Sequence, residues 1–282
     1  MKIAISTETT VDLTKDLIDK YNVKIVPFTV NLGNDSFLDG EITSEEIIAY
    51  VDKTGVLPKT SAVNEFQYEE HFGNILKEYD AIIHISLSSE LSCAFNNACK
   101  VATKLKNVFV IDSRSLSTGI ALLVIYAAKL IEKGFSPEEI YNKVLSRVPN
   151  VQASFALNRL DYLYKGGRCS SLMYFGANIL KIRPQIILKD GKMVSGNKYR
   201  GNMSIICKKY LSDVLSEFSN PDLEEVFITY TTCPSEIIDS IKKTLIDYGF
   251  KNINVTRAGG TITSHCGEQC LGVLYINDGG KN

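Results

Sequence analysis

Strand-like and helix-like segments alternate along the chain, and this alternation limits the folds that it can adopt. Short runs rich in β-branched residues, such as Ala81–Ser86 and Val108–Ile111, precede segments with apolar residues at helical spacing, as in Leu91–Leu105 and Leu116–Lys133. Strands that alternate with helices are typical of βαβ units, in which a helix connects two parallel strands. We therefore expect an α/β fold whose N-terminal part contains a largely parallel sheet.

Local signals predict where several elements begin and end. Capping boxes at Thr43-Ser44-Glu45-Glu46 and Asn64-Glu65-Phe66-Gln67 indicate two helix starts. Asp12 is the expected cap of a helix that begins at Leu13. One strand is expected over Lys24–Val30. Leu57–Ser61 is predicted to be a loop, because it contains a proline.

The pattern breaks at Pro149-Asn150, near the middle of the chain. A chain of 282 residues exceeds the usual size of one domain, which is roughly 100–200 residues. We therefore predict two α/β domains, residues 1–150 and residues 151–282. The second is expected to begin with a strand over Val151–Leu157 and to contain a β-hairpin with Asp190-Gly191 as its turn.

The charge balance disfavours several classes of function. The chain has 31 Lys and Arg against 32 Asp and Glu, a net charge of −1. This balance gives no basic surface for nucleic acid or anionic membranes.

The longest apolar run, Gly119–Ala128, is too short for a membrane span, which takes about 20 residues. The N-terminal sequence lacks the apolar stretch of a secretory signal, so we expect a cytoplasmic protein.

The sequence also lacks the common marks of metal and cofactor sites. Seven cysteines without an export signal do not suggest a disulfide framework. His265-Cys266 and Cys270 are the nearest approach to a metal cluster, but structural zinc sites show two paired ligand groups. His84 lies in an apolar run and is predicted to be a core residue. There is no dinucleotide-binding glycine motif, no phosphate-binding loop and no nucleophile elbow, and we predict no cofactor.

Four short polar motifs lie at predicted element ends, where ligands bind in open α/β sheets. Thr60-Ser61 follows Pro58, and the hydroxyl-rich segment Ser86–Ser92 follows a strand and opens a helix. Hydroxyls and free backbone N–H groups at a helix start suit an anion such as a carboxylate. Thr60-Ser61 taken alone is better explained as a turn and helix entry, whereas plain helix capping is an equal alternative for Ser86–Ser92.

The other two motifs contain glycines. Ser264-His265-Cys266-Gly267 is predicted to lie in a loop before the last strand, and a loop histidine beside glycines is compatible with binding. Gly166-Gly167 precedes Arg168, whose guanidinium could bind an anion in a bidentate manner. A simple turn with a solvated arginine is the alternative. Arg200 by itself indicates only a surface charge.

Together the motifs resemble the DegV family, whose members include the fatty-acid-binding subunits of bacterial fatty acid kinases. The resemblance extends over essentially the whole chain. The segments that carry it are Glu8-Thr9-Thr10-Val11-Asp12-Leu13, Asp39-Gly40, Leu57-Pro58-Lys59-Thr60-Ser61, Ser88-Ser89-Glu90-Leu91-Ser92, Ile111-Asp112-Ser113, Leu163-Tyr164-Lys165-Gly166-Gly167-Arg168, Ile182-Arg183-Pro184, Arg200 and His265-Cys266-Gly267.

The resemblance implies a protein that holds one long-chain fatty acid between two α/β domains. It implies that Thr60, Ser61, Ser92 and His265 bind the carboxylate. The expected partner is a separate ATP-dependent kinase that forms an acyl phosphate, which implies a role in phospholipid metabolism. We expect Arg168 and Arg200 to contact phosphate or the kinase and not the buried carboxylate.

Three positions depart from the usual family pattern near the expected head-group site. Cys93 stands where the family usually has glycine, and Glu268 and Gln269 replace a Pro-Gly pair. These changes bear on the backbone shape around the carboxylate.

A different class of function would use the same residues as catalysts. In a Ser/His hydrolase or acyltransferase, Ser92 would be the nucleophile and His265 the base, with Asp112 orienting the histidine. The missing nucleophile elbow argues against this alternative. A small-molecule kinase acting alone is disfavoured by the missing phosphate-binding loop.

Overall fold

The N-terminal part of the computed structural model contains a parallel sheet, as predicted. The structure describes residues 1–169 and 183–280. The sheet has the order β2-β1-β6-β7, with every pair parallel, and its strands are β1 (Ile3–Glu8), β2 (Lys24–Val26), β6 (Ala81–Ser86) and β7 (Val108–Asp112). The helices of this part are α1 (Lys15–Tyr21), α3 (Glu65–Ile75), α4 (Ala94–Ala102), α5 (Thr118–Glu132) and α6 (Pro137–Arg147).

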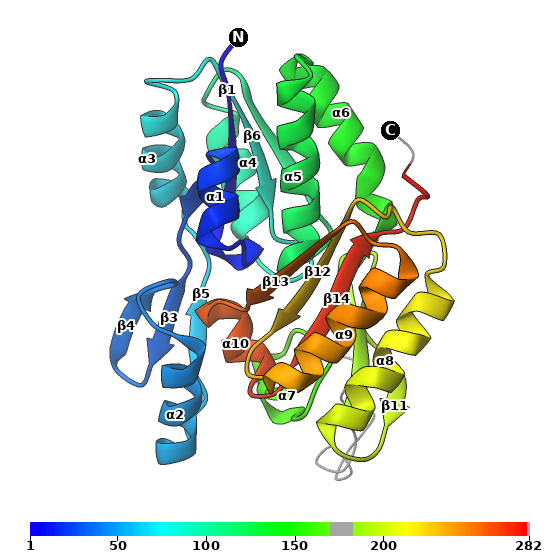
Figure 1. Ribbon diagram of the computed structural model, residues 1–282. Coiled ribbons are helices and arrows are strands. Elements are labelled where there is room, and N and C mark those ends of the chain that lie inside the picture. Colours follow the sequence, from blue (N-terminus) through cyan, green and yellow to red (C-terminus); the bar gives the residue numbers. More distant parts are fainter. Residues whose placement is uncertain (170–182, 281–282) are drawn as a thin grey trace.

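A small antiparallel sheet follows β2 and projects from this part of the molecule (Figure 1). It contains β3 (Thr29–Leu32), β4 (Asp35–Leu38) and β5 (Lys59–Ser61), with α2 (Ser44–Thr54) between β4 and β5. Two predictions were therefore wrong. The strand expected over Lys24–Val30 is interrupted at Pro27-Phe28, where proline lacks the N–H that would continue the ladder. The expected loop at Leu57–Ser61 ends in β5, which pairs with β3.

The C-terminal part contains a mixed sheet of order β11-β10-β9-β14-β12-β13, in which β8 also pairs with β14. Its strands are β8 (Val151–Gln152), β9 (Ser154–Ala156), β10 (Arg183–Lys189), β11 (Lys192–Tyr199), β12 (Glu225–Tyr230), β13 (Asn252–Arg257) and β14 (Leu271–Ile276). Its helices are α7 (Asp161–Gly166), α8 (Met203–Glu217), α9 (Ser235–Tyr248) and α10 (Gly260–Cys266).

Two features of this sheet concern the predictions directly. The hairpin is confirmed, with Asp190 and Gly191 at positive φ in its two-residue turn. The strand expected over Val151–Leu157 is divided at Ala153 into β8 and β9. The α/β fold class is therefore confirmed in both halves, with a parallel sheet only in the first.

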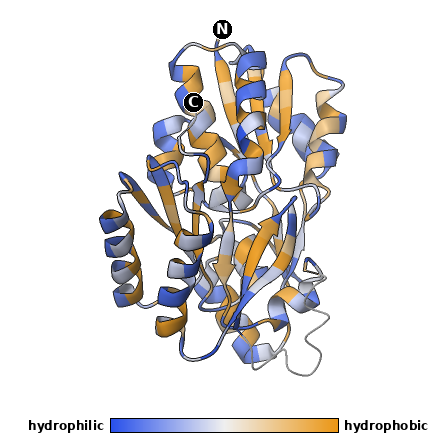
Figure 2. Cartoon of the chain, turned by 90° about the vertical axis from the view of Figure 1, so that its right-hand side faces the viewer, coloured by the Kyte–Doolittle hydropathy of each residue, from blue (hydrophilic) through white to orange (hydrophobic). Residues whose placement is uncertain are grey.

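The change of strand partners coincides with the predicted boundary at residue 150. Among the described residues, strands before it pair with one another, and strands after it do likewise. However, α5 contacts β1 and β6 of the first half as well as β12 and β14 of the second. One hydrophobic cluster contains residues of both halves, and many of the strands carry apolar residues (Figure 2). We keep two domains divided at residue 150 as a proposal.

No helix in the described ranges is long and apolar enough to cross a membrane.

Two carboxylates from the N-terminal part hold α10, although the sequence predicted a loop there. Asp39 accepts hydrogen bonds from the backbone N–H groups of Gly260 (2.7 Å) and Thr261 (3.1 Å). Asp12 accepts one from the N–H of Gly259 (2.7 Å) and another from the Ser117 hydroxyl. The carboxyl oxygens of these two residues satisfy N–H groups that have no partner within the helix.

Asp12 thus has a different role from the predicted one. The first helix begins at Lys15 with Thr14 as its N-cap, and Asp12 follows a short 3-10 turn with φ of 52°. Its side chain caps a helix almost 250 residues further along the chain. This long-range contact could not be inferred from local capping signals.

The buried Asp12 carboxyl provides a test of this anchor. Burial raises the pKa of Asp12 to about 8, and the nearby Asp39 contributes in the same direction. Between its ordinary value near 4 and about 8, the folded state holds a proton that the unfolded state has released. The free energy of unfolding should therefore fall as pH rises through this window. Asp12→Asn keeps a side-chain oxygen that can accept from the N–H of Gly259, but its side chain does not titrate in this pH range. The stability of this variant should therefore depend less on pH.

Urea unfolding of both proteins between pH 5 and pH 8 checks this expectation. The stability of the wild type relative to Asp12→Asn should decrease steadily with pH. Parallel stability curves would contradict the raised pKa of Asp12.

Candidate functional site

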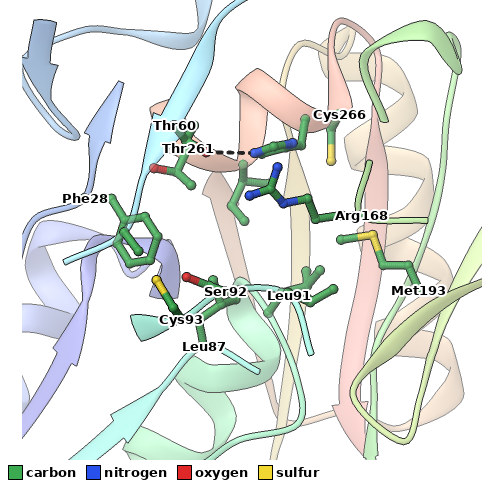
Figure 3. Close-up of a pocket in the computed structure, with 14 residues that line it drawn as sticks. Phe28, Thr60, Leu87, Leu91, Ser92, Cys93, Arg168, Met193, Thr261 and Cys266 are labelled. Atoms are coloured by element: carbon green, nitrogen blue, oxygen red, sulfur yellow. Dashed lines mark hydrogen bonds between the residues drawn. The ribbon is translucent and has the colours of Figure 1, made fainter. Parts of the chain in front are cut away.

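A cavity of about 270 Å³ lies where α10 meets the N-terminal part of the molecule (Figure 3). Most of its wall is apolar, and hydroxyls, a histidine and an arginine add polar groups. The lining residues are Phe28, Thr60, Ala62, Leu87, Leu91, Ser92, Cys93, Leu116, Arg168, Met193, Thr261, Ile262, His265 and Cys266. A mostly apolar cavity with few polar groups is typical of a small-molecule site.

Three of the predicted carboxylate ligands line this cavity. Thr60 comes from β5, Ser92 from the turn before α4, and His265 from α10. The Thr60 hydroxyl is hydrogen-bonded to Nε2 of His265 at 2.9 Å (Figure 3). The Ser92 hydroxyl accepts a hydrogen bond from the N–H of Ala94 at 3.2 Å.

Ser61 does not join them. Successive side chains of a strand point to opposite faces, and Thr60 and Ser61 are neighbours in β5. Ser61 is exposed and does not line the cavity; its hydroxyl accepts a weak hydrogen bond from Asn31 at 3.4 Å. The short strand thus separates two residues that the motif placed together.

His265 lies in an environment that favours the neutral imidazole. Burial, together with the positive charge of Arg168, lowers the pKa of His265 to about 4. Its Nδ1 atom is buried and has no hydrogen-bond partner within the described part of the chain. A Cβ on Gly166 would lie 2.6 Å from this atom. Gly166 therefore permits the close approach of α7 to the histidine, and Gly167, with φ of 70°, ends α7.

The two arginines lie in different places. Arg168 lines the cavity, where its side chain points inward, but it remains exposed (Figure 3). Its guanidinium donates to the carbonyl of Gly166 at 2.7 Å. Arg200 lines a separate hollow of about 320 Å³, together with Lys198 and Lys209. Ser170 and Ile182, which belong to the sequence motifs near these arginines, lie outside the described residues.

The buried carboxylate of Glu8 holds the start of the loop that carries Ser92. It accepts hydrogen bonds from the N–H of Leu87 (3.0 Å), the hydroxyls of Tyr68 (2.6 Å) and Ser86 (2.7 Å), and Nε2 of His84 (3.1 Å). Burial opposes its ionisation, but His84 and these hydrogen bonds lower the pKa of Glu8 overall. His84 is a core residue, as predicted. It also takes part in a polar network that the sequence did not reveal.

The C-terminal hairpin closes another side of the cavity. The Ser88 hydroxyl donates to the carbonyl of Gly191 at 2.8 Å, and Met193 of the same hairpin lines the cavity. A Cβ on Gly191 would lie 2.6 Å from the Ser88 hydroxyl oxygen. This turn thus requires glycine for both its positive φ and its close contact with the other half of the molecule.

The residues of the catalytic alternative do not form a triad. His265 pairs with Thr60 through Nε2, and no hydrogen bond in the described structure joins it to Ser92 or Asp112. The Asp112 carboxylate instead accepts from the N–H and hydroxyl of Ser89 and from the N–H of Arg114. Asp112 was therefore placed wrongly as the residue that orients His265.

Within the described ranges, no group of three His, Cys, Asp or Glu side chains could hold a metal ion.

Comparisons with known proteins agree with this architecture. The family model described as "Uncharacterised protein, DegV family" matches residues 2–278. A DegV domain-containing protein of Clostridium acetobutylicum is 32% identical over 278 residues, which cover 98% of each chain.

Solved structures extend the comparison to the fold. A DegV family protein of Thermus thermophilus has a TM-score of 0.90 at 24% identity, covering 99% of this chain and 100% of the other. DegV of Bacillus subtilis, described as a fatty acid binding protein, has a TM-score of 0.86 at 25% identity with the same coverage. With the family match over nearly its whole length, the chain belongs to the DegV family.

Proposed function

We propose that the protein binds a long-chain fatty acid and presents its carboxylate to a separate kinase, which forms an acyl phosphate. The observation that carries the proposal is the cavity, in which Thr60, Ser92 and His265 gather beside a mostly apolar wall. Fatty acid binding by the related DegV of Bacillus subtilis supports the same ligand class.

The apolar wall and the polar cluster have different roles in this proposal. A C16 acid has about 14 methylenes, and burying each contributes roughly 0.8 kcal/mol, or about 11 kcal/mol before ordering costs. The tail therefore supplies most of the affinity. The hydroxyls of Thr60 and Ser92 and the neutral His265 fix the position of the carboxylate. Ser61 has no place in this head-group site because it points away from the cavity.

The arginines are proposed to assist the transfer of phosphate to the fatty acid carboxylate. In this proposal the partner binds ATP, in keeping with the lack of a phosphate-binding loop motif in this sequence. Arg168 is exposed at the cavity, where it can meet the phosphate as it forms, and a guanidinium fits phosphate oxygens bidentately. Arg200, Lys198 and Lys209 give their hollow three cationic residues suited to an acidic face of a kinase.

The first expected outcome is that the purified protein carries fatty acid. Mass spectrometry of the organic extract from denatured protein should give close to one fatty acid per chain, or protein stripped of lipid should take one up. An extract without lipid, together with no uptake of supplied fatty acid, would contradict the proposal.

Removing a head-group hydroxyl should weaken binding without abolishing it. Thr60→Ala and Ser92→Ala each remove one hydrogen bond to a charged acceptor, worth roughly 1.5–3 kcal/mol, which corresponds to a loss of affinity on the order of 10- to 100-fold. Ser61→Ala is the matched control and should bind normally. The check is a competition assay with a fluorescent fatty acid; equal affinity in all three variants would refute the head-group site.

Removing either arginine should impair phosphorylation of the bound fatty acid without impairing fatty acid binding. Arg168→Ala and Arg200→Ala are expected to retain fatty acid but to form little acyl phosphate with a cognate kinase and ATP. Lys242→Ala, an exposed cation on α9, is the control and should support normal phosphorylation. Loss of lipid from both arginine variants, or full phosphorylation in both, would overturn this division of roles.

A further inference from the structure

A second, smaller hollow lies next to the cavity, in the seam between the two halves. Its volume is about 20 Å³, and it lies beside the ends of β12 and β14. The cavity and the hollow share three lining residues, Leu116, Ile262 and Cys266. We call these three residues the dividing wall, because each of them borders both the cavity that contains the polar cluster and the second hollow.

The second hollow suits hydrocarbon. Phe155 and Leu274 line it, and its threonines direct their hydroxyls to protein partners. The Thr229 hydroxyl is hydrogen-bonded to that of Thr118 at 2.6 Å, and the Thr231 hydroxyl accepts from the N–H of Cys270 at 3.1 Å. A tail that leaves the polar cluster and passes the dividing wall would therefore enter a largely apolar space.

Among the three residues of the dividing wall, Ile262 is the one whose substitution should disturb the hydrophobic core least. Leu116 and Cys266 are each 4% exposed and belong to the hydrophobic core, whereas Ile262 is only half-buried. Ile262 also lies on α10 three residues before His265, so one helix carries both a head-group residue and part of the wall. The anchored α10 thus fixes the distance between these two points.

We propose that Ile262, supported by Leu116, sets the length of the acyl chain that the site accepts. This inference rests on the proposed fatty acid binding. Each additional buried methylene raises affinity by about fourfold as long as the chain finds space. The gain stops where the tail meets the dividing wall, because the hollow beyond it is too small to hold several carbons.

The test compares Ile262→Ala and Ile262→Phe with the wild type in binding saturated fatty acids of twelve to twenty carbons. Ile262→Ala should join the cavity to the hollow and move the preferred length toward longer chains, with a change of about tenfold or more in the affinity ratio of long to short acids. Ile262→Phe should move the preference toward shorter chains. Ile246→Phe is the control, since Ile246 is 55% exposed on α9 and should leave the profile unchanged.

The outcomes separate this inference from the function on which it rests. Binding of fatty acids with the same length profile in Ile262→Ala and the wild type would overturn the role of Ile262 and leave the proposed function intact. Failure of the wild type to bind any of these acids would refute both. If Ile262→Phe does not fold, Ile262→Val provides an intermediate size and should shift the preferred length less than Ile262→Ala.

Discussion

The attachment of α10 to the N-terminal part is the interaction on which the candidate site depends. Asp39 and Asp12 bind three successive backbone N–H groups at the start of this helix, from Gly259 to Thr261. Because α10 has only seven residues, this anchor at its beginning also determines where His265 lies near its end. The same helix supplies Thr261, Ile262 and Cys266 to the cavity wall. Without these two carboxylates, the helix would lose partners for its N–H groups, and the cavity would lose the placement of its polar residues.

The cavity forms from segments that are far apart in the chain, and each segment has its own fixed support. Glu8 holds the N–H of Leu87 at the start of the loop that leads to Ser92. Pairing of β5 with β3 directs Thr60 toward His265. The contact of Ser88 with Gly191 joins the C-terminal hairpin to the same loop. The polar end of the cavity is therefore built on strands, helix ends and tight turns, which suits a site that must hold one carboxylate in a defined position.

Local sequence patterns were sufficient for the parallel sheet and the hairpin, because hydrophobic periodicity and the Asp190-Gly191 turn are local signals. They failed where tertiary contacts decide the structure. β5 is a strand only because β3 pairs with it, and α10 receives its caps from Asp12 and Asp39, more than 200 residues away. In the structure Thr60, Ser92 and His265 line one cavity. The opposite orientation of Ser61 and the separate hollow at Arg200 depended on strand register and packing.

Carbon-13 NMR of a bound fatty acid labelled at its carboxyl carbon tests the central claim most directly, because it reports the surroundings of the head group itself. We predict one bound carboxyl resonance, distinct from that of the free acid. Its position should change in Thr60→Ala and Ser92→Ala and stay the same in Ser61→Ala, because only the first two side chains line the cavity. An identical bound resonance in the wild type and all three variants would contradict a carboxylate held by these hydroxyls.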